Sequence, residues 1–166
     1  PDSVVSIGDD AFYWCINLTN VTIPSSVTRI GTAAFRACSS LGAITVATNN
    51  PVYSSVGGVL FNQRQTTLLQ YPVGKADSDY SIPGTVTGIG DQAFFNCYRL
   101  THVTIPSSVS AVRSEAFWAC RGLTAVTLPD SVTSLGSGAF NLCIGLTRVT
   151  IGSGLTRIGP YTFGSC

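Results

Sequence analysis

A spacing of 23 residues between cysteines restricts the fold of this chain more than any other feature. The cysteines lie at positions 15, 38, 97, 120, 143 and 166, so that four of the five intervals are 23 residues and one is 59. The period defines full repeats at 1–23, 24–46, 83–105, 106–128 and 129–151, a partial repeat at 152–166 and a longer segment at 47–82. Such short units bury their apolar sides only against stacked neighbours. We therefore predict a single solenoid domain over residues 1–166.

Each repeat contains the signals for one strand and two further sides. In repeat 83–105, the closing Val103-Thr104-Ile105 alternates apolar and polar β-branched residues, which is typical of a strand. Pro106 then ends this main strand, because proline cannot donate to a strand ladder. The spacing of Ala93, Phe94 and Cys97 is compatible with one buried face of a helical turn. We predict an α/β solenoid with a face of parallel strands, and with short helical or 3-10 turns and extended legs on its other sides.

The longer segment 47–82 contains two β-rich runs. Residues 58–62 and 66–71 flank Gln63-Arg64-Gln65, which predicts a hairpin. We expect one strand of this hairpin to continue the solenoid ladder and the rest to protrude, with Arg64 near its tip.

The repeat pattern resembles a known family. Its consensus is Cys-x-x-Leu-x-x-Val-x-Ile-Pro-x-x-Val-x-x-Ile-Gly-x-x-Ala-Phe-x-x-Cys, which is similar to the BspA-type leucine-rich repeat, a 23-residue class of surface proteins in bacteria and some protists. The likeness covers residues 1–46 and 83–166 directly, and segment 47–82 resembles a longer variant unit. The resemblance implies a right-handed leucine-rich repeat coil, an extracellular or cell-surface location and adhesion.

Composition argues against several classes of partner. The chain is 45% hydrophobic and 10% charged, with 9 basic and 8 acidic residues and no basic run. It therefore lacks the electrostatic footprint of a nucleic-acid-binding protein. No apolar stretch approaches the roughly 18 residues that a membrane-spanning helix needs, so we expect no membrane insertion.

Residues for catalysis or metal binding are scarce. The chain has one histidine, His102, and one glutamate, Glu115, so no cluster of titratable groups is expected. The cysteine spacing differs from that of zinc ligands. We predict no enzyme activity, no cofactor and no metal. Cysteine packs well in cores, so we expect a ladder of buried thiols, with disulfides between neighbouring coils as the alternative.

Positions that vary between repeats are the candidates for ligand contact. Aromatic residues and arginine recur around the cysteines, and both are enriched at binding hot spots. The candidates on this side are Tyr13, Trp14, Phe95, Tyr98, Trp118 and Arg121. A second surface is the strand face with Asn20, His102 and Arg148, and a third is the hairpin with Arg64. The alternative is that the aromatic residues only pack laterally between coils.

Together these features predict a non-enzymatic protein-binding or adhesion module of a cell-surface or secreted protein. The expected partner is another protein or a host or matrix component. A structural spacer or stalk, or an accessory domain attached to an enzyme, remains open as the alternative. Neither end shows a capping sequence, so we expect a fragment of a longer array, with end-to-end self-association through its uncapped ends.

Overall fold

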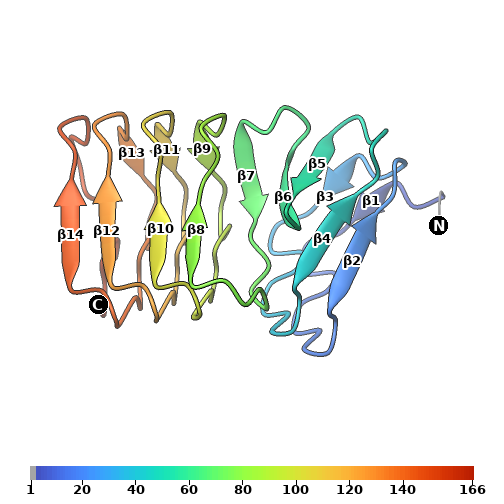
Figure 1. Cartoon of the computed structure of the whole chain (residues 1–166), viewed down its shortest axis with the longest axis horizontal. Coiled ribbons are helices and arrows are strands. Elements are labelled where there is room, and N and C mark those ends of the chain that lie inside the picture. The colour runs from blue at the N-terminus through green and yellow to red at the C-terminus, as the bar shows by residue number, and fades with distance from the viewer. Residues whose placement is uncertain (1–2) are drawn as a thin grey trace.

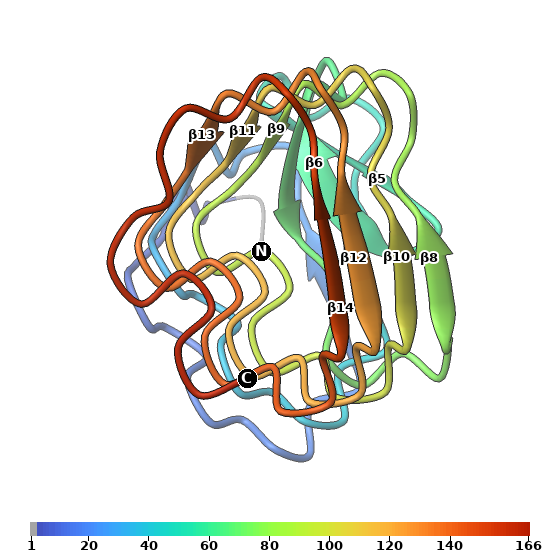
Figure 2. The ribbon, with the colours of Figure 1, turned by 90° about the vertical axis from the view of Figure 1, so that its left-hand side faces the viewer.

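The chain forms a stack of coils that enclose a core. The computed structural model describes residues 3–166, so the first two residues of repeat 1–23 lie outside the described residues. Figure 2 shows the coils nested around a common axis, and Figure 1 shows the stack from the side. One face carries the main strands: β2 (Asn20–Ile23), β4 (Ala43–Val46), β8 (Asp79–Ser81), β10 (His102–Thr104), β12 (Ala125–Leu128) and β14 (Arg148–Ile151). The predicted face of parallel strands is confirmed.

Neighbouring main strands pair in register one repeat apart. Val21 lies opposite Ile44, and Val126 lies opposite Val149, in the parallel pairs β2–β4 and β12–β14. The extended legs form two further parallel ladders of two-residue strands, one before and one after segment 47–82: β1 (Ser6–Ile7) with β3 (Arg29–Ile30), and β9 (Gly88–Ile89) with β11 (Ala111–Val112) and β13 (Ser134–Leu135). Equivalent residues of successive repeats therefore line up along the axis.

The predicted helical turns are wrong, and with them the α/β class. Residues 3–166 contain no α-helix or 3-10 helix, and so no helix that could cross a membrane. The third side of each coil is a run of turns in which every fourth residue has a left-handed backbone, as at Gln92 (φ 56°) and Asn96 (φ 59°). A left-handed residue at this spacing breaks an α-helix. The amide of Phe94 consequently donates to the Ala116 carbonyl of the next coil at 2.7 Å, instead of to a residue four positions earlier.

Two ladders of side chains fill the core. The phenylalanine rings stack along the axis, with centroids 4.6 Å apart for Phe94–Phe117 and 4.9 Å for Phe117–Phe140. Each stacked aromatic pair stabilises by about 1 kcal/mol beyond its buried area. Beside the rings, cysteine thiols donate to phenylalanine carbonyls of the preceding coil, as Cys120 Sγ does to Phe94 O at 3.0 Å. The cysteines thus satisfy buried carbonyl groups as well as filling space.

Segment 47–82 interrupts this regular stack. It forms β5 (Tyr53–Val56), β6 (Val59–Asn62) and β7 (Thr67–Gln70), joined as an antiparallel meander. Strand β7 pairs in parallel with β9, so the prediction that one strand continues the ladder is confirmed. The prediction that the rest protrudes is wrong, because Val59, Leu60 and Phe61 of β6 are buried. The solvent-exposed part of the β6–β7 turn is Gln63 and Arg64.

Strand β6 is a wall between two hydrophobic cores. Val59 and Phe61 pack in the core that extends toward the C-terminus, whereas Leu60 packs in the core formed by residues of the first two repeats. The alternation follows from strand geometry, which points successive side chains to opposite faces. Figure 1 shows β2 and β4 together on one side of this insertion, inclined to the other main strands, which lie on its opposite side. We call β5 and β6, residues 53–62, the wedge.

A buried asparagine fixes the chain where it enters the wedge. The Asn50 side chain is 5% exposed, and its Nδ2 donates to the carbonyls of Pro24 and Val27 at 2.8 and 2.9 Å. Its Oδ1 accepts the amides of Val52 and Tyr53 at 2.9 and 2.8 Å. One side chain thus joins the second repeat to the start of β5.

Candidate binding surface

The variable residue that follows each Ala-Phe pair forms a ladder along one corner of the solenoid. The guanidinium carbon of Arg36 lies 4.3 Å from the ring centroid of Phe95 and 5.7 Å from that of Tyr13. The Phe95 ring in turn stacks on Trp118, with 4.5 Å between centroids and 8° between planes. Tyr13, Arg36, Phe95 and Trp118 therefore form one continuous column, which we call the corner ladder.

Segment 47–82 contributes no aromatic or arginine side chain to the corner ladder, and Arg36 fills the resulting gap between Tyr13 and Phe95. Tyr71 occupies the ring position of this coil, stacked 5.2 Å from Phe94, and the next residue is Pro72. The Arg36 guanidinium nevertheless contacts Phe95 of the following repeat. Its Nε is buried and forms no hydrogen bond with the described residues. Stacking of a guanidinium between aromatic rings is a cation–π arrangement, so the charge is held in a defined place.

The exposure of the corner residues divides them into two groups. Phe95 is only 6% exposed and Trp118 is half-buried, so these rings pack laterally and support the surface. Tyr13, Trp14 and Tyr98 are 47%, 63% and 40% exposed, and Arg121 is also exposed. Trp14 meets Tyr13 edge to face at 5.9 Å. The lateral-packing alternative therefore describes Phe95, whereas Tyr13, Trp14 and Tyr98 present apolar surface to solvent.

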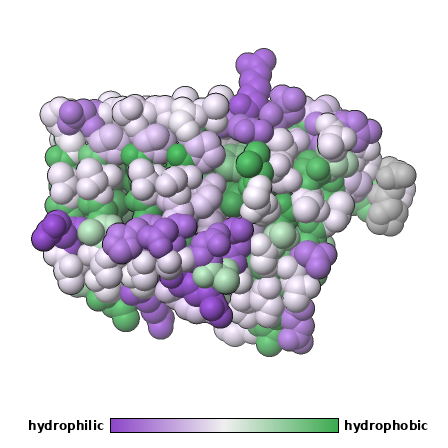
Figure 3. Space-filling model, in the orientation of Figure 1, coloured by the Kyte–Doolittle hydropathy of each residue, from purple (hydrophilic) through white to green (hydrophobic). Residues whose placement is uncertain are grey.

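The strand face has a different chemistry. Thr101, Thr124 and Thr147 each donate their hydroxyl to a carbonyl of the preceding coil at 3.1 to 3.3 Å. These hydroxyls are already used within the protein. Figure 3 shows this face as mostly pale, with hydrophilic residues in small groups and no broad hydrophobic area.

The structure brings His102 together with a residue that sequence reasoning missed. Its Nδ1 lies 3.3 Å from Asp79 Oδ1, and both side chains are well exposed. Asp79 occupies the same strand position in β8 as His102 does in β10. Its place was hidden because segment 47–82 departs from the 23-residue period. Asn20 and Arg148 lie on the same face in the distant strands β2 and β14, so the three predicted residues do not form one site.

Arg64 lies at the exposed β6–β7 turn and is remote in sequence from the corner and strand-face candidates. Asn62 orders this turn by accepting the amides of Thr66 and Thr67 at 2.8 and 3.0 Å. The turn lies at the upper edge of the molecule in Figure 1.

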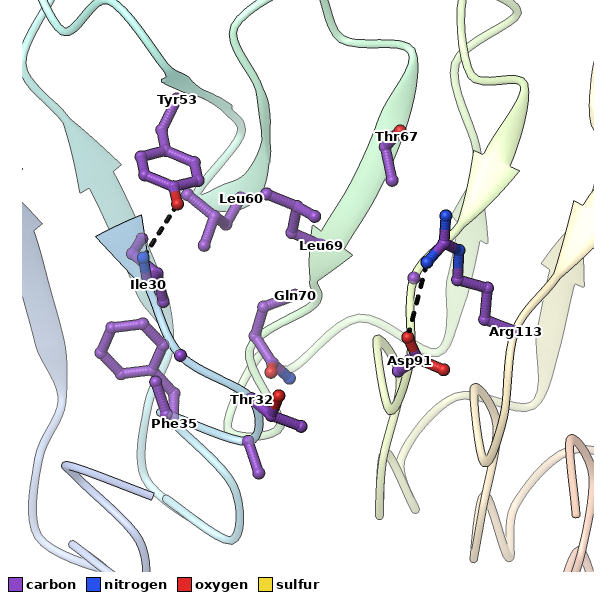
Figure 4. Close-up of a pocket in the computed structure, with 14 residues that line it drawn as sticks. Ile30, Thr32, Phe35, Tyr53, Leu60, Thr67, Leu69, Gln70, Asp91 and Arg113 are labelled. Atoms are coloured by element: carbon purple, nitrogen blue, oxygen red, sulfur yellow. Dashed lines mark hydrogen bonds and ion pairs between the residues drawn. The ribbon is translucent and has the colours of Figure 1, made fainter. Parts of the chain in front are cut away.

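A cavity of about 310 Å³ lies beside the wedge. Its walls are the turn after β3, with Ala34 and Phe35, and the wedge and β7 opposite, with Leu60 and Leu69. Figure 4 shows Gln70 extending toward Thr32 across this space and the Asp91–Arg113 ion pair at one side. Sequence analysis missed the cavity, because it arises from the break between the two cores and not from any repeat.

The titratable side chains of the described residues are dispersed, and the cysteines among them are mostly buried. In residues 3–166 there is no group of three or more His, Cys, Asp or Glu side chains that could hold a metal ion. All six cysteines are free thiols, of which four are buried. Burial raises the pKa of Cys97 and of Cys120, and burial followed by the charge of the neighbouring Cys166 raises the pKa of Cys143 to about 12. These thiols remain protonated at neutral pH and are poor nucleophiles.

A family model and the similar solved structures both point to leucine-rich repeat proteins. The BspA type leucine rich repeat region matches in six copies over residues 1–73 and 76–166. Among curated proteins no relative was found. A leucine-rich repeat protein from Eubacterium ventriosum is 31% identical with a TM-score of 0.85, and the match covers 91% of this chain and 40% of that protein.

Two further solved structures are also similar. A leucine rich cell surface protein from Faecalibacterium prausnitzii is 29% identical with a TM-score of 0.77, over 100% of this chain and 50% of that one. The pneumococcal vaccine antigen PcpA is 26% identical with a TM-score of 0.72, over 87% of this chain and 42% of that one. The chain thus spans half or less of the length of these relatives. Through its six matched repeats, it belongs to the BspA-type leucine-rich repeat family.

Proposed function

We propose that this solenoid is a non-enzymatic protein-binding module of a cell-surface or secreted protein, and that it binds through the corner ladder and the exposed aromatic residues beside it. The observation that carries the proposal is the placement of Tyr13, Trp14 and Tyr98, which expose apolar surface although the repeats could bury their cores without them. Large aromatic side chains and arginine supply most of the binding energy at protein interfaces.

The corner also has the rigidity that such an interface needs. Phe95 and Trp118 are stacked, and Arg36 is held between Phe95 and Tyr13. A preorganised surface loses less side-chain entropy on binding. The surface location is supported by the relative described as a cell surface protein and by the one described as a vaccine antigen. Host or matrix proteins are therefore the partners that we would test first.

The test is binding to a panel of purified extracellular-matrix and host cell-surface proteins, measured by biolayer interferometry. Once a partner is found, Trp14→Ala and Tyr98→Ala should each weaken binding by at least about tenfold, as expected when a hot-spot residue is truncated. Val56→Ala is the matched control, because Val56 is also an exposed apolar residue but lies at the β5–β6 turn.

The strand face provides the competing outcome. If His102→Ala or Arg148→Ala abolishes binding while Trp14→Ala and Tyr98→Ala do not, the corner is the wrong surface. If neither the unmodified chain nor any of these variants binds a member of the panel, the spacer role is favoured instead.

A further inference from the structure

Alternate backbone amides on the turn side of each coil form a ladder to the next coil. In the first coil, the amides of Asp10, Phe12 and Trp14 donate to carbonyls of the second coil at 3.0, 2.8 and 3.1 Å. The equivalent donors in three later coils are Gln92, Phe94 and Asn96; Glu115, Phe117 and Ala119; and Gly138, Phe140 and Leu142. On the turn side, each coil thus directs only N–H groups toward the following coil. The carbonyl groups of the residues in between accept hydrogen bonds from the preceding coil, as those of Thr32, Ala34 and Arg36 do.

The wedge interrupts this ladder after the second coil. Among the described residues, no acceptor forms a hydrogen bond with the amides of Ala33, Phe35 or Ala37, which are the equivalent donors there. Buried backbone amides are nearly always paired in proteins. Phe35 is only 3% exposed, so its free amide is unusual.

Elsewhere the wedge replaces the missing acceptors. The amide of Ile30 donates to the Tyr53 hydroxyl at 2.9 Å, that of Ile44 to the Gly58 carbonyl at 2.8 Å, and that of Val46 to Ser55 Oγ at 2.9 Å. The second coil therefore has its strand-side donors satisfied by the wedge, while three turn-side donors are left open.

Two of these open donors belong to Ala33 and Phe35, which line the cavity of about 310 Å³ described above. Ala33 and Ala37 have left-handed backbones, with φ of 56° and 60°. The open amides are those of alternate residues, because the Arg36 amide between Phe35 and Ala37 donates to the Ala33 carbonyl at 2.9 Å. Oriented backbone N–H groups carry partial positive charge and attract anions. The cavity volume is at the small end of the range for ligand pockets.

The residues that line the cavity restrict the chemical class of ligand that it could bind. A row of donors without acceptors fits a group that only accepts, and a carboxylate offers two oxygens with several lone pairs. Ile30, Leu60 and Leu69 add apolar lining, which fits an apolar substituent next to that carboxylate. The rim carries Asp91, whose charge opposes an anion, but Arg113 pairs with it at 3.8 Å.

We propose that this cavity captures the C-terminal carboxylate of a peptide that ends in a small apolar residue. The carboxylate oxygens accept hydrogen bonds from the amides of Ala33 and Phe35, the last side chain lies against Leu60 and Leu69, and the preceding peptide leaves past Thr32 and Thr67. Capture of a chain terminus by a nest of backbone amides is a recurring mode of peptide recognition. The site is separate from the corner ladder, so either proposal can fail alone.

The test uses the isotope-labelled chain and amide chemical shifts. The probe is the peptide N-acetyl-Ala-Ala-Val with a free carboxylate, and its C-terminal amide and acetate are the comparison ligands. Saturable downfield shifts of the Ala33 and Phe35 amides are expected with the free acid. The affinity for the capped amide should be lower by at least about tenfold, which corresponds to about 1.4 kcal/mol.

A variant at the mouth of the cavity tests the location. Thr32 is exposed and its side chain lines the cavity, so Thr32→Trp should block the probe and abolish the shifts. Ser114→Trp is the matched control, since the Ser114 amide donates to Asp91 Oδ1 as the Thr32 amide donates to Asp9 Oδ1, whereas Ser114 is not part of the lining of this cavity. Thr67→Phe is a second blocking variant in case the first disturbs folding.

Several results would overturn the proposal. Equal affinity for the capped amide would exclude carboxylate recognition, and equal affinity for acetate would exclude a peptide as the preferred source. Absence of any shift at Ala33 and Phe35 with millimolar probe, or unchanged binding by folded Thr32→Trp and Thr67→Phe, would exclude the cavity as the site.

Discussion

The hydroxyl of Tyr53 accepts a hydrogen bond from the backbone amide of Ile30 at 2.9 Å. In a regular coil, this amide would instead donate to a strand carbonyl of the next repeat. Ile30 ends the ladder formed by β1 and β3, and the following leg strand in the chain, β7, pairs with β6 and β9 instead. The wedge can therefore separate the two ladders without leaving this amide unpaired.

Replacing Tyr53 with phenylalanine removes this acceptor alone. The Ile30 amide would lose its partner in a partly buried place, so we expect Tyr53→Phe to lower the free energy of unfolding by about 1 kcal/mol. Urea denaturation followed by circular dichroism measures the change. Tyr13→Phe is the control and should have no measurable effect, because the Tyr13 hydroxyl is on an exposed side chain. Equal stability of Tyr53→Phe and the wild type would show that water replaces the hydroxyl at no cost.

Asn50 should be among the most sensitive polar residues. Its side chain makes four hydrogen bonds, two given and two accepted, and it is buried. Asn50→Ala leaves all four backbone groups without that partner, so we expect a loss of about 3 kcal/mol in the free energy of unfolding. The neighbouring Asn49 is exposed, and Asn49→Ala provides the matched control in the same denaturation experiment. Equal free energies of unfolding for the two variants would show that the four hydrogen bonds of Asn50 do not stabilise the fold.

The repeat period alone predicts most of the fold. Strand positions such as Val103 and Thr104 follow from β-branched alternation, and the core positions of Phe94 and Cys97 follow from their recurrence. The turns were misread because a spacing of one and three residues fits both a helical face and a chain of turns. What decides between them is the axial hydrogen-bond ladder to the next coil, which single-sequence periodicity does not record.

The site was only partly predictable for a related reason. Trp14 and Tyr98 could be selected as candidates because they vary at fixed repeat positions, and both side chains are exposed. Asp79, Arg36 and Tyr53 were missed, because their contacts depend on how segment 47–82 is threaded between neighbouring coils. A contact that results from breaking a repeat leaves no periodic signal.

The alternation along β6 leads to a prediction about local stability. Leu60 packs in the core of the first two repeats, whereas Phe61, the next residue, packs in the other core. Because solenoid stability is transmitted mainly between neighbouring coils, Leu60→Ala should cost about 3 kcal/mol and act mostly on the N-terminal side. Native-state hydrogen exchange should then speed up at Val27 and Ile44 more than at Val109 and Val132. Phe61→Ala should give the reverse pattern, and a uniform increase in both variants would mean that the cores unfold as one unit.

The buried thiols should make the fold sensitive to alkaline pH. Burial raises the pKa of Cys143 from 9.0 to about 12, and raises that of Cys97 and Cys120 in the same direction. The unfolded chain therefore loses these protons first as the pH rises above about 9, while the folded chain keeps them. The stabilisation is fully present below pH 9 and is lost progressively toward pH 12.

Urea denaturation under reducing conditions at pH 8, 9 and 10 measures this loss. The free energy of unfolding should fall across the series, and the fall should be smaller in Cys143→Ala, because one of the responsible groups is gone. The series ends at pH 10 because Tyr80, whose pKa burial also raises to about 12, adds to the loss once the pH passes the ordinary tyrosine pKa of about 10 in the unfolded chain. A wild-type free energy that is the same at pH 8 and pH 10 would mean that the thiols are hydrated in the folded state, which contradicts a buried cysteine ladder.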